Sequence, residues 1–389
     1  MSSLPDRDSF AQKILIVTRN LPPLVGGMER LNWHMAEELA KYADVHVIGP
    51  KGAAALKPPS TTLTEAPLTP LPLFLLAAFF KGLWIALRWK PDVILAGSGL
   101  TAPIVWLLSK LCSARSAAYL HGFDITVNHS LYRRLWRPTF KKLDMVIVNS
   151  TPTQTLAIAA GVNPSSISIA YPGVSLPDAP HPTESIAAFK EQHGLTGKKI
   201  LLSVGRLTTR KGLREFVEQA LPAIVKAEPD TMLIVIGEAP KNSLGACTQT
   251  VESIQDQAEQ SGVAEHIKFL GVITDRDLLA TAYEAADVHV FPVRHIPDDP
   301  EGFGMVAIEA AAHGLPTVAF ACGGVIDAVG EGQSGHLITP GNYPALTQAV
   351  LQVLAVDPEP RRTNITAFAQ SFAWPVFGRR INRIIYDRI

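Results

Sequence analysis

Two glutamates with a fixed spacing carry the clearest chemical signal in the sequence. Glu301 and Glu309 stand at the ends of a short apolar stretch that glycines open. An α-helix over 303–313 would separate them by about 12 Å along its axis. The N–H groups and the dipole at the start of such a helix bind anions, and Gly302 and Gly304 allow close approach of the backbone. The pattern predicts a site for an elongated phosphorylated ligand, with a sugar at one end, a ribose at the other and a diphosphate between them, held without a metal ion.

The residues around this pair resemble a known family. The stretch PEGFGMVAIEAAAHGLP, which contains both glutamates, resembles the E-x7-E motif of the retaining nucleotide-sugar glycosyltransferases of glycosyltransferase family 4. The resemblance implies that Glu301 is a catalytic residue that contacts hydroxyl groups of the donor sugar and that Glu309 contacts the nucleotide ribose. A solvent-facing helix with acidic ends is the alternative, but it leaves the glycines unexplained. The donor-binding residues implied here are Phe303, Gly304, Met305 and Glu309.

A basic loop follows the strand expected at Ile200–Val204. Its sequence, GRLTTRKG from Gly205 to Gly212, resembles the diphosphate clamp of the same family. Departure of a nucleoside diphosphate leaves growing negative charge on the β-phosphate, which a bidentate arginine and a mobile lysine can stabilise. We therefore expect Arg206 and Lys211 to be catalytic, Gly205 to bind the donor and Arg210 to be structural. A solvated basic turn is the alternative.

The first half of the chain offers weaker candidates. Gly26 and Gly27 follow the first expected strand, as in the family's GG loop, and are expected to approach the donor or acceptor with their backbone N–H groups; an ordinary loop between strand and helix is the alternative. His121 ends another strand within an HG-x-D motif. The resemblance implies that His121 is a catalytic residue that contacts the donor sugar and that Asp124 orders the acceptor or a loop, although a lone histidine is usually structural.

Composition sets the protein class. The chain has 389 residues, 47% of them hydrophobic, so that two or three domains with large cores are expected. Cys112, Cys247 and Cys322 show no metal or disulfide spacing, and the first ten residues lack the apolar core of a signal peptide. Equal numbers of basic and acidic residues give a formal charge of zero, which argues against bulk attraction to nucleic acid. A cytoplasmic protein is expected.

Short apolar runs alternate with helical patterns in two halves of the chain, which predicts α/β architecture with parallel sheets covered on both faces. The expected strands are Lys13–Thr18, Val45–Ile48, Val93–Ala96, Ala117–Leu120, Met145–Val148, Ile200–Val204, Met232–Ile236, Ile267–Leu270, Val288–Phe291 and Pro316–Phe320. A proline-rich segment, Tyr171–Pro182, separates the halves. We expect two doubly wound Rossmann-like domains, 1–178 and 179–370, facing across a cleft. The resemblance identifies this as the GT-B architecture, in which a final helix, 371–389, returns to the first domain.

Several other chemistries lack their minimal motifs, because the sequence contains no GxGxxG, GxxxxGK[ST], HExxH or GxSxG. Glycoside hydrolysis needs two carboxyl groups roughly 5–9.5 Å apart, closer than the helical spacing of Glu301 and Glu309. The resemblance implies retaining chemistry, in which the diphosphate leaves and the acceptor hydroxyl enters on the same face, with no cofactor and no metal.

The segment 71–90 is the most apolar window, although Lys81 and Arg88 interrupt it and its unbroken apolar run is too short to span a membrane. Its aromatic residues and flanking cations suit a helix lying on a membrane surface, and a second basic patch falls within 133–142. We give equal weight to membrane contact at these two segments and to two amphipathic helices that cover the first sheet.

The sequence therefore predicts a cytoplasmic glycosyltransferase, placed at the inner face of the membrane if that contact exists. It would move a sugar from a GDP or UDP donor, GDP-mannose first, to a hydroxyl of a glycan or lipid-linked glycan. A sugar-nucleotide epimerase or a phosphorylase on the same fold is the alternative among enzymes. A catalytically silent nucleotide-sugar-binding module is the alternative outside them. The sequence leaves the donor, the acceptor, the linkage and the oligomeric state open.

Overall fold

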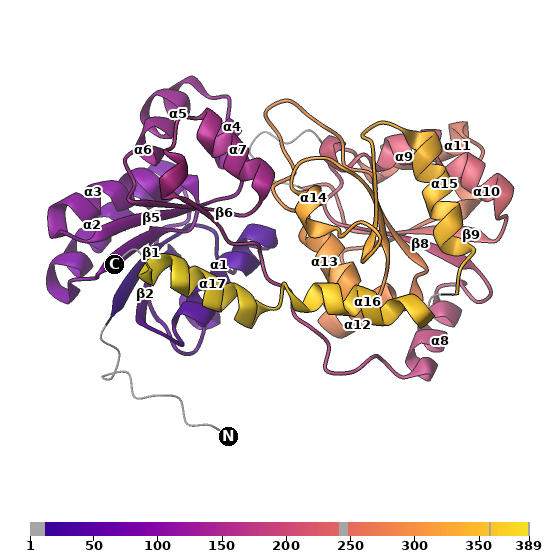
Figure 1. Cartoon of the computed structure of the whole chain (residues 1–389), viewed down its shortest axis with the longest axis horizontal. Helices are drawn as coiled ribbons and strands as arrows, with labels where there is room; N and C mark the ends of the chain where they lie inside the picture. Colours follow the sequence, from indigo (N-terminus) through magenta and orange to yellow (C-terminus); the bar gives the residue numbers. More distant parts are fainter. Residues whose placement is uncertain (1–11, 241–247, 358, 388–389) are drawn as a thin grey trace. The chain divides into compact units, whose positions relative to one another are not determined.

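The computed structural model describes residues 12–240, 248–357 and 359–387, which divide into two compact units (Figure 1). Unit one comprises the described residues up to Gly173 and those from Trp374 onward, and unit two runs from Val174 to Ala373. The division falls five residues before the expected boundary at 178, because Val174 already pairs with Ala373 in unit two. The expectations for Cys247 and the first ten residues lie outside the described residues.

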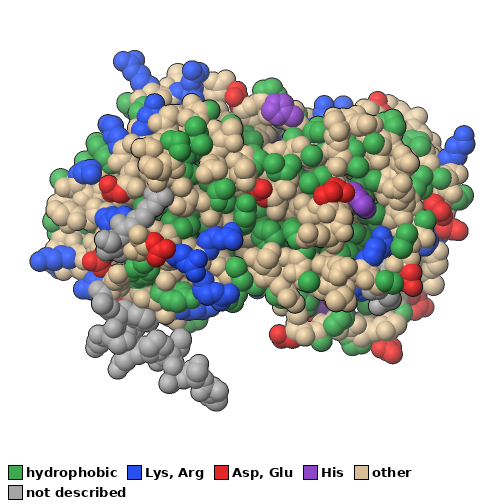
Figure 2. Space-filling view, viewed as in Figure 1, with side chains coloured by type: hydrophobic (Ala, Val, Ile, Leu, Met, Phe, Trp, Pro, Cys, Tyr) green, Lys and Arg blue, Asp and Glu red, His purple; other side chains and the backbone are tan. Residues whose placement is uncertain are grey.

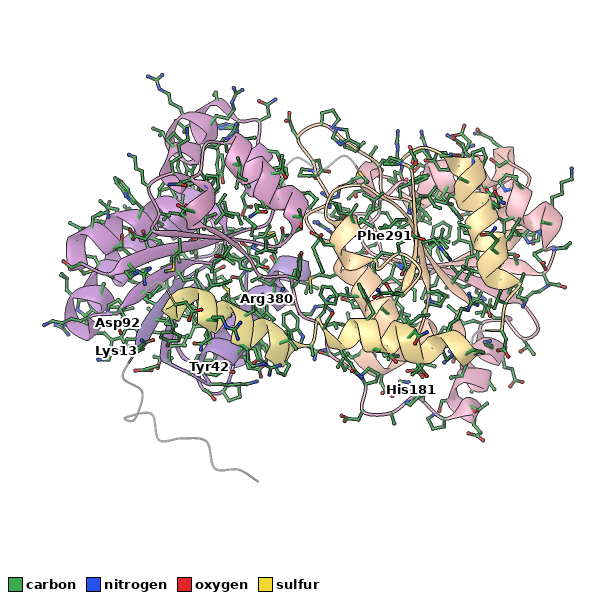
Figure 3. The ribbon with its side chains drawn as sticks, viewed as in Figure 1. Lys13, Tyr42, Asp92, His181, Phe291 and Arg380 are labelled. Carbon is green, nitrogen blue, oxygen red and sulfur yellow. The ribbon has the colours of Figure 1, made fainter. Side chains whose placement is uncertain are left out.

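Unit one is built on a seven-stranded parallel sheet with the order β3-β2-β1-β4-β5-β6-β7. Its strands are β1 (Lys13–Val17), β2 (Asp44–Pro50), β3 (Thr62–Ala66), β4 (Val93–Ala96), β5 (Arg115–Leu120), β6 (Met145–Val148) and β7 (Ile167–Ile169). The five central strands agree with the sequence prediction. The two edge strands escaped it, because β3 is polar and half-exposed and β7 is three residues long. Next to β1, the Lys13 N–H donates to Asp92 at 2.8 Å (Figure 3).

The connections between parallel strands are right-handed, so this strand order places helices on both faces of the sheet. One face carries α1 (Gly27–Leu39), which packs against α17 (Trp374–Tyr386). The two helices approach closely at Gly378, where a Cβ would lie 2.8 Å from that of Glu38. The His34 ring also stacks on Trp374 with 4.0 Å between centroids. The other helices of the unit are α2 (Leu71–Trp89), α3 (Ala102–Cys112), α4 (Phe123–Thr126), α5 (Ser130–Leu135), α6 (Arg137–Phe140) and α7 (Thr151–Ala159).

Unit two repeats the design with a six-stranded parallel sheet in the order β10-β9-β8-β11-β12-β13. Its strands are β8 (Lys199–Val204), β9 (Thr231–Ile236), β10 (Ile267–Gly271), β11 (Val288–Phe291), β12 (Thr317–Phe320) and β13 (Gly335–Ile338). All but the edge strand β13 agree with the prediction. Because the chain winds in opposite directions from the neighbouring strands β8 and β11, the carboxyl ends of these two strands form a switch point, where open α/β sheets bind ligands.

Helices cover both faces of the second sheet, and its core is formed by residues such as Ile200, Leu202, Ile234 and Ala310. Helix α13 packs on α16, and α12 packs on α8 (Figure 1). The helices are α8 (Thr183–Gln192), α9 (Leu213–Gln219), α10 (Leu221–Ala227), α11 (Val251–Gln260), α12 (Arg276–Ala285), α13 (Met305–Ala312), α14 (Val325–Ala328), α15 (Tyr343–Leu354) and α16 (Glu359–Gln370).

Candidate active site

The loops after β8 and β11 meet at the switch point of the second sheet. Gly212 ends the basic loop with a φ of +67°, and a Cβ there would lie 2.2 Å from the carbonyl oxygen of Pro292. Any larger residue would force these backbones apart, so that glycine is required on both counts. This contact fixes the basic loop against the segment that leads to Glu301.

Lys211 and Glu301 are in direct contact within unit two. The Lys211 Nζ lies 2.9 Å from Glu301 Oε2, and it also lies 4.5 Å from the centre of the Phe291 ring, which ends β11 (Figure 3). The side chains of Lys211 and Glu301 are 16% and 10% exposed. The Phe291 ring and the Glu301 carboxylate fix the position of the Lys211 ammonium, because the cation–π contact adds to the ion pair. The structure thus brings together two of the predicted catalytic residues.

Arg210 extends this pair into a network. Its guanidinium contacts Asp299, lies 3.2 Å from Glu301 Oε2 and donates to the Pro300 carbonyl at 3.2 Å. Arg210 was expected to be structural, and these contacts with Asp299, Pro300 and Glu301 support such a role. Arg206, predicted to be catalytic, is exposed at the start of the same loop. We name the side chains of Arg206, Arg210, Lys211, Asp299 and Glu301 the charged cluster.

Burial and the charges within the cluster shift the pKa values of Glu301, Lys211 and Arg210. Burial alone would raise the pKa of Glu301, but Lys211 and Arg210 outweigh it and hold that pKa at about 2. Burial lowers the pKa of Lys211, although Glu301 opposes the shift. Burial would also lower the pKa of Arg210, and its two carboxylate partners raise it instead. Three cations against two carboxylates leave a net positive charge, which suits a phosphate ligand.

Helix α13 begins later than the sequence predicted. It runs from Met305 to Ala312, with Gly304 as its N-cap at a φ of +98°. A Cβ on Gly304 would lie 2.9 Å from the Phe291 ring, so that the turn needs glycine for both its conformation and its space. Glu301 therefore precedes the helix instead of starting it. Three residues between Glu301 and the helix, 302–304, are not helical, so the helical rise behind the predicted separation of about 12 Å does not apply to the whole segment.

The turn before α13 is mostly buried. Phe303 is 3% exposed, and its ring packs against Phe372 with 5.8 Å between centroids, so the ring is closed to a donor. Met305 is half-buried at the first helical position. Behind the turn, the Gly324 N–H donates to the Glu301 carbonyl at 2.8 Å. Gly323 and Gly324 thus pack directly against the backbone of this segment.

Glu309 has a partner that the sequence did not reveal. The Tyr283 hydroxyl donates to Glu309 Oε2 at 3.1 Å, and the Tyr283 ring stacks on His313 at 5.5 Å and 2°. His313 Nδ1 lies 3.0 Å from Glu284 Oε1, which also lies 3.1 Å from His181 Nδ1. No motif marks Tyr283, because it belongs to another helix 26 residues away. Tyr283 is buried. Its neighbours in the sequence do not distinguish it from a tyrosine of the hydrophobic core.

Asp299 is paired although another acid precedes it. Adjacent acids such as Asp298 and Asp299 are typical of a solvated loop, yet the Asp299 side chain is 13% exposed and paired with Arg210. The sequence offers one indication of the pair between Arg210 and Asp299: the loops after β8 and β11 carry opposite charges, and both follow the carboxyl ends of strands. Among the described residues, no group of three His, Cys, Asp or Glu side chains is placed to hold a metal ion.

In unit one, His121 and Asp124 lie together after β5. His121 Nε2 lies 2.9 Å from the Gly97 carbonyl oxygen, and the ring is buried. Asp124 Oδ2 accepts from the Gly99 N–H at 2.9 Å and from the His121 N–H at 3.3 Å. Asp124 is thus placed to organise the loops after β4 and β5, one of its two predicted roles.

Gly26 and Gly27 lie at the start of α1. Gly27 is its first residue and Gly26 its N-cap, so that the free N–H groups of the first turn lie beside the glycines. Glu29 occupies the same turn and accepts from Asn20 Nδ2 at 2.8 Å. A Cβ on Gly26 would meet the Glu29 carboxylate at 2.4 Å. The position fits a backbone-binding loop, while Glu29 sets negative charge beside it.

Two family descriptions match the sequence over most of its length. Residues 25–177 match "Glycosyltransferase Family 4", and residues 185–370 match "Glycosyl transferases group 1". The matched segments fall in unit one and unit two, and each contains the candidate residues of that unit.

Named proteins are similar to the chain over most of its length. The GDP-mannose-dependent alpha-(1-6)-phosphatidylinositol monomannoside mannosyltransferase of Mycolicibacterium smegmatis is 27% identical over 96% of this chain and 98% of that protein. The D-inositol 3-phosphate glycosyltransferase of Corynebacterium diphtheriae is 26% identical over 76% of this chain and 70% of that protein.

Solved structures share the fold. Anabaena Alr3699/HepE in complex with UDP superposes with a TM-score of 0.77 at 23% identity, over 97% of this chain and 100% of that one. The sucrose-phosphate synthase of Thermosynechococcus elongatus gives a TM-score of 0.75 at 24% identity, over 97% of this chain and 98% of that one. Both agree with two Rossmann-like units of the kind described above.

Proposed function

We propose, from the premise that the chain belongs to the glycosyltransferases of the family 4 type with the GT-B fold, that it transfers a sugar with retention of configuration. The donor is a nucleoside diphosphate sugar, and the acceptor is a hydroxyl of a glycan or lipid-linked glycan. The observation that carries the proposal is the charged cluster of unit two, set beside the N-terminus of α13.

The charged cluster suits a leaving diphosphate. When the bond between the anomeric carbon and the phosphate oxygen breaks, the electron pair stays on the β-phosphate, where Lys211 and Arg206 stabilise it. The N–H groups at the start of α13 add their dipoles, so we propose that no metal ion is needed. The acceptor oxygen bonds to the same face of the anomeric carbon, and its proton passes to the departing phosphate oxygen.

The remaining residues bind and orient the donor. We assign Glu301 to the hydroxyl groups of the sugar, and Lys211 and Arg210 keep it a carboxylate, able to accept hydrogen bonds, throughout the physiological pH range. Glu309 would accept hydrogen bonds from the ribose while Tyr283 holds its other side. We also assign to His121 the contact with the donor sugar that the resemblance to the family implies.

GDP-mannose is the proposed donor, and a UDP-sugar is the alternative. The name of the M. smegmatis relative supports GDP-mannose and a lipid-linked acceptor, since it specifies both for that protein. The complex of Alr3699/HepE with UDP keeps the alternative open. We place the reaction in the cytoplasm at the inner face of the membrane, where a water-soluble donor and a lipid-linked acceptor can meet.

Ligand-dependent melting tests the nucleotide first. A ligand that binds only the folded state raises the melting temperature with its occupancy. We expect GDP and GDP-mannose to raise it in the presence of EDTA, and Lys211→Ala to abolish the shift. Equal behaviour of UDP and GDP would remove the preference for GDP-mannose, and no shift with any nucleoside diphosphate would overturn the proposal.

Turnover is tested next with radiolabelled donor. Incubation without an acceptor should leave the donor intact, whereas an epimerase converts it unaided. Addition of a mannosylated glycolipid should yield a longer glycolipid with the configuration of the donor. Nucleotide binding without turnover on any glycan or glycolipid acceptor would identify a binding module instead.

A further inference from the structure

Helix α2 exposes one apolar stripe to solvent. The residues of the stripe recur at helical spacing, and each is between 44% and 58% exposed: Leu73, Leu76, Phe80, Trp84 and Leu87. The opposite side of α2, with Phe74, Ala78 and Ile85, is buried in the core of unit one. The stripe is therefore surplus apolar surface, because the fold already uses the other side of the helix.

Neighbouring helices extend this surface. Helix α2 packs on α3, α3 packs on α6, and α5 packs on α6. On α3, Leu107 is 41% and Leu111 is 51% exposed, and on α5 Leu131 and Leu135 are 53% and 54% exposed. In Figure 2 hydrophobic and basic side chains lie close together on this part of unit one. We call the outer surface of α2, α3 and α5 the α2 face.

The sequence of the α2 face is strongly basic, although the whole chain has no net charge. Between Leu71 and Leu143 there are ten Lys and Arg residues and two Asp residues. Of the two acids, Asp124 is buried against the backbone of the β4 and β5 loops, and Asp92 accepts from the Lys13 N–H at the start of β1. The exposed cations in this stretch are Lys81, Arg88, Lys90, Lys110, Arg133, Arg134, Lys141 and Lys142.

Some of these cations rest on aromatic rings. The guanidinium of Arg88 lies 4.4 Å from the centre of the Trp84 ring, and the ammonium of Lys142 lies 4.5 Å from that of Trp106. A ring with a cation beside it suits the boundary between acyl chains and headgroups, since the ring enters the apolar layer and the cation meets phosphate.

We propose that the α2 face docks on an anionic lipid surface, with the α2 stripe in the outer acyl region and the surrounding cations on the headgroups. Within the described residues α2 is long and apolar enough to cross a bilayer by length and composition. Its buried side belongs to the core of unit one, however, so that in this fold it lies along the surface. A second copy of the chain is a poorer occupant, because a twofold contact would set like charges against each other.

This inference rests on the lipid-linked acceptor of the proposed function, but its test needs no turnover. Flotation with vesicles of phosphatidylcholine alone or with 30 mol% phosphatidylglycerol, a fraction chosen as roughly that of an anionic membrane, measures binding directly. The full chain should float with the anionic vesicles at low salt and should lose most of its binding at high salt. It should not float with the neutral vesicles.

Two double variants separate the apolar and the ionic contributions. F80S/W84S should weaken binding at least about tenfold, because two large side chains no longer enter the lipid. R133S/R134S should weaken it roughly 25-fold, at about fivefold for each cation, and should reduce the salt dependence. The matched controls lie in unit two: V272S/V356S for exposed apolar residues, and K226S/R276S for exposed cations.

The outcomes are distinct. All variants are exposed at the surface, so unchanged circular dichroism and melting should show that the fold persists. Failure of the wild type to float, or equal effects of the unit-two controls, would overturn the docking surface. A wild-type dimer that F80S/W84S dissociates, without vesicle binding, would identify an interface between copies instead and would also overturn it. Nucleotide-induced melting shifts report the proposed function separately, because they involve the charged cluster and no lipid.

Discussion

The switch points of the two sheets use different bonds to hold their loops. In unit two, Lys211, Arg210 and Asp299 meet around Glu301 through ionic contacts. In unit one, His121 and Asp124 bind backbone carbonyl and N–H groups of the β4 and β5 loops. The same topology thus carries a charged site in one unit and a backbone-organised site in the other.

This difference suggests a division of labour. A charged cluster can redistribute its contacts when a phosphate arrives, since Lys211 has three donors and one carboxylate partner at 2.9 Å. The Asp124 carboxylate accepts hydrogen bonds from two backbone N–H groups, so it has little freedom to change its contacts when a ligand binds. We therefore expect substitutions in unit two to alter nucleotide affinity and turnover together, and substitutions in unit one to alter stability and turnover while nucleotide affinity stays the same.

The largest expected effect comes from Lys211→Ala. Loss of the ammonium takes away a positive charge that stabilises the leaving diphosphate. The kcat/KM for transfer should therefore fall by roughly 10²–10³. Nucleotide affinity, measured by calorimetry, should fall as well. Lys226→Ala, an exposed lysine on α10, is the control and should behave like the wild type. Lys211→Arg keeps the charge and should restore part of the affinity; a Lys211→Ala enzyme with normal kcat/KM would remove the lysine from the mechanism.

Glu301→Gln should change both catalysis and acid stability. The pKa of Glu301 is about 2 in the folded chain, below its ordinary value of 4.5, because Lys211 and Arg210 oppose the effect of burial. The carboxylate therefore stabilises the fold above about pH 4.5, and this contribution disappears as the pH falls toward 2. Denaturant midpoints measured from pH 6 to pH 2.5 should fall less steeply for Glu301→Gln than for the wild type.

The control for this experiment is Glu259→Gln, an exposed residue of α11. It should leave the acid limb unchanged, since an exposed carboxylate has little to lose on protonation. Parallel acid limbs for wild type and Glu301→Gln would show that the ion pairs with Lys211 and Arg210 do not stabilise the folded state.

The sequence predicted most of the fold because the central strands of both units are apolar on both sides. β4, β6, β11 and β12 are fully buried, and such strands appear in the sequence as continuous apolar runs. Edge strands lack this signal. β3 reads TLTEA, which is equally typical of a loop, and becomes a strand by pairing with β2. The start of α13 was missed by two residues because Gly304 takes a left-handed conformation that spacing alone does not reveal.

The residues of the candidate site were predictable where they lie within one continuous sequence motif. The basic loop and the segment around Glu301 appear as compact motifs, and Lys211 and Glu301 do meet in the structure. Partners from separate elements were missed. The Tyr283 contact with Glu309 joins α12 to α13 and depends on how these helices pack, which the sequence does not encode locally.

A moderate effect is expected from Asp124→Ala in unit one. It leaves the N–H groups of Gly99 and His121 without a charged acceptor in a buried place, which should cost about 2–3 kcal/mol of stability. Asp124→Asn keeps an acceptor oxygen and should recover part of this loss. Calorimetric affinity for the nucleotide should remain within about twofold of wild type. A large loss of affinity would contradict the division between the two units.

The smallest effect should come from Tyr283→Phe, which tests whether neutral hydrogen bonds also matter in the charged unit. The substitution removes the hydroxyl that donates to Glu309 Oε2 and keeps the ring that stacks on His313. A neutral donor to a carboxylate in a partly exposed place contributes about 1 kcal/mol, so nucleotide affinity should fall about fivefold. Tyr42→Phe, at a tyrosine of unit one that is 36% exposed (Figure 3), is the matched control.

The result for Tyr283→Phe can be assigned to Glu309 with a second ligand. If Tyr283 positions Glu309 for the ribose, the variant should lose affinity for a nucleoside diphosphate and should lose much less for its 2′,3′-dideoxy analogue, which offers Glu309 no hydroxyl. The turnover number should change less than KM, because the contact is made in the ground state as well as in the transition state. An equal loss for both ligands would mean that the hydroxyl of Tyr283 stabilises the packing of α12 on α13 and has no part in recognising the ribose.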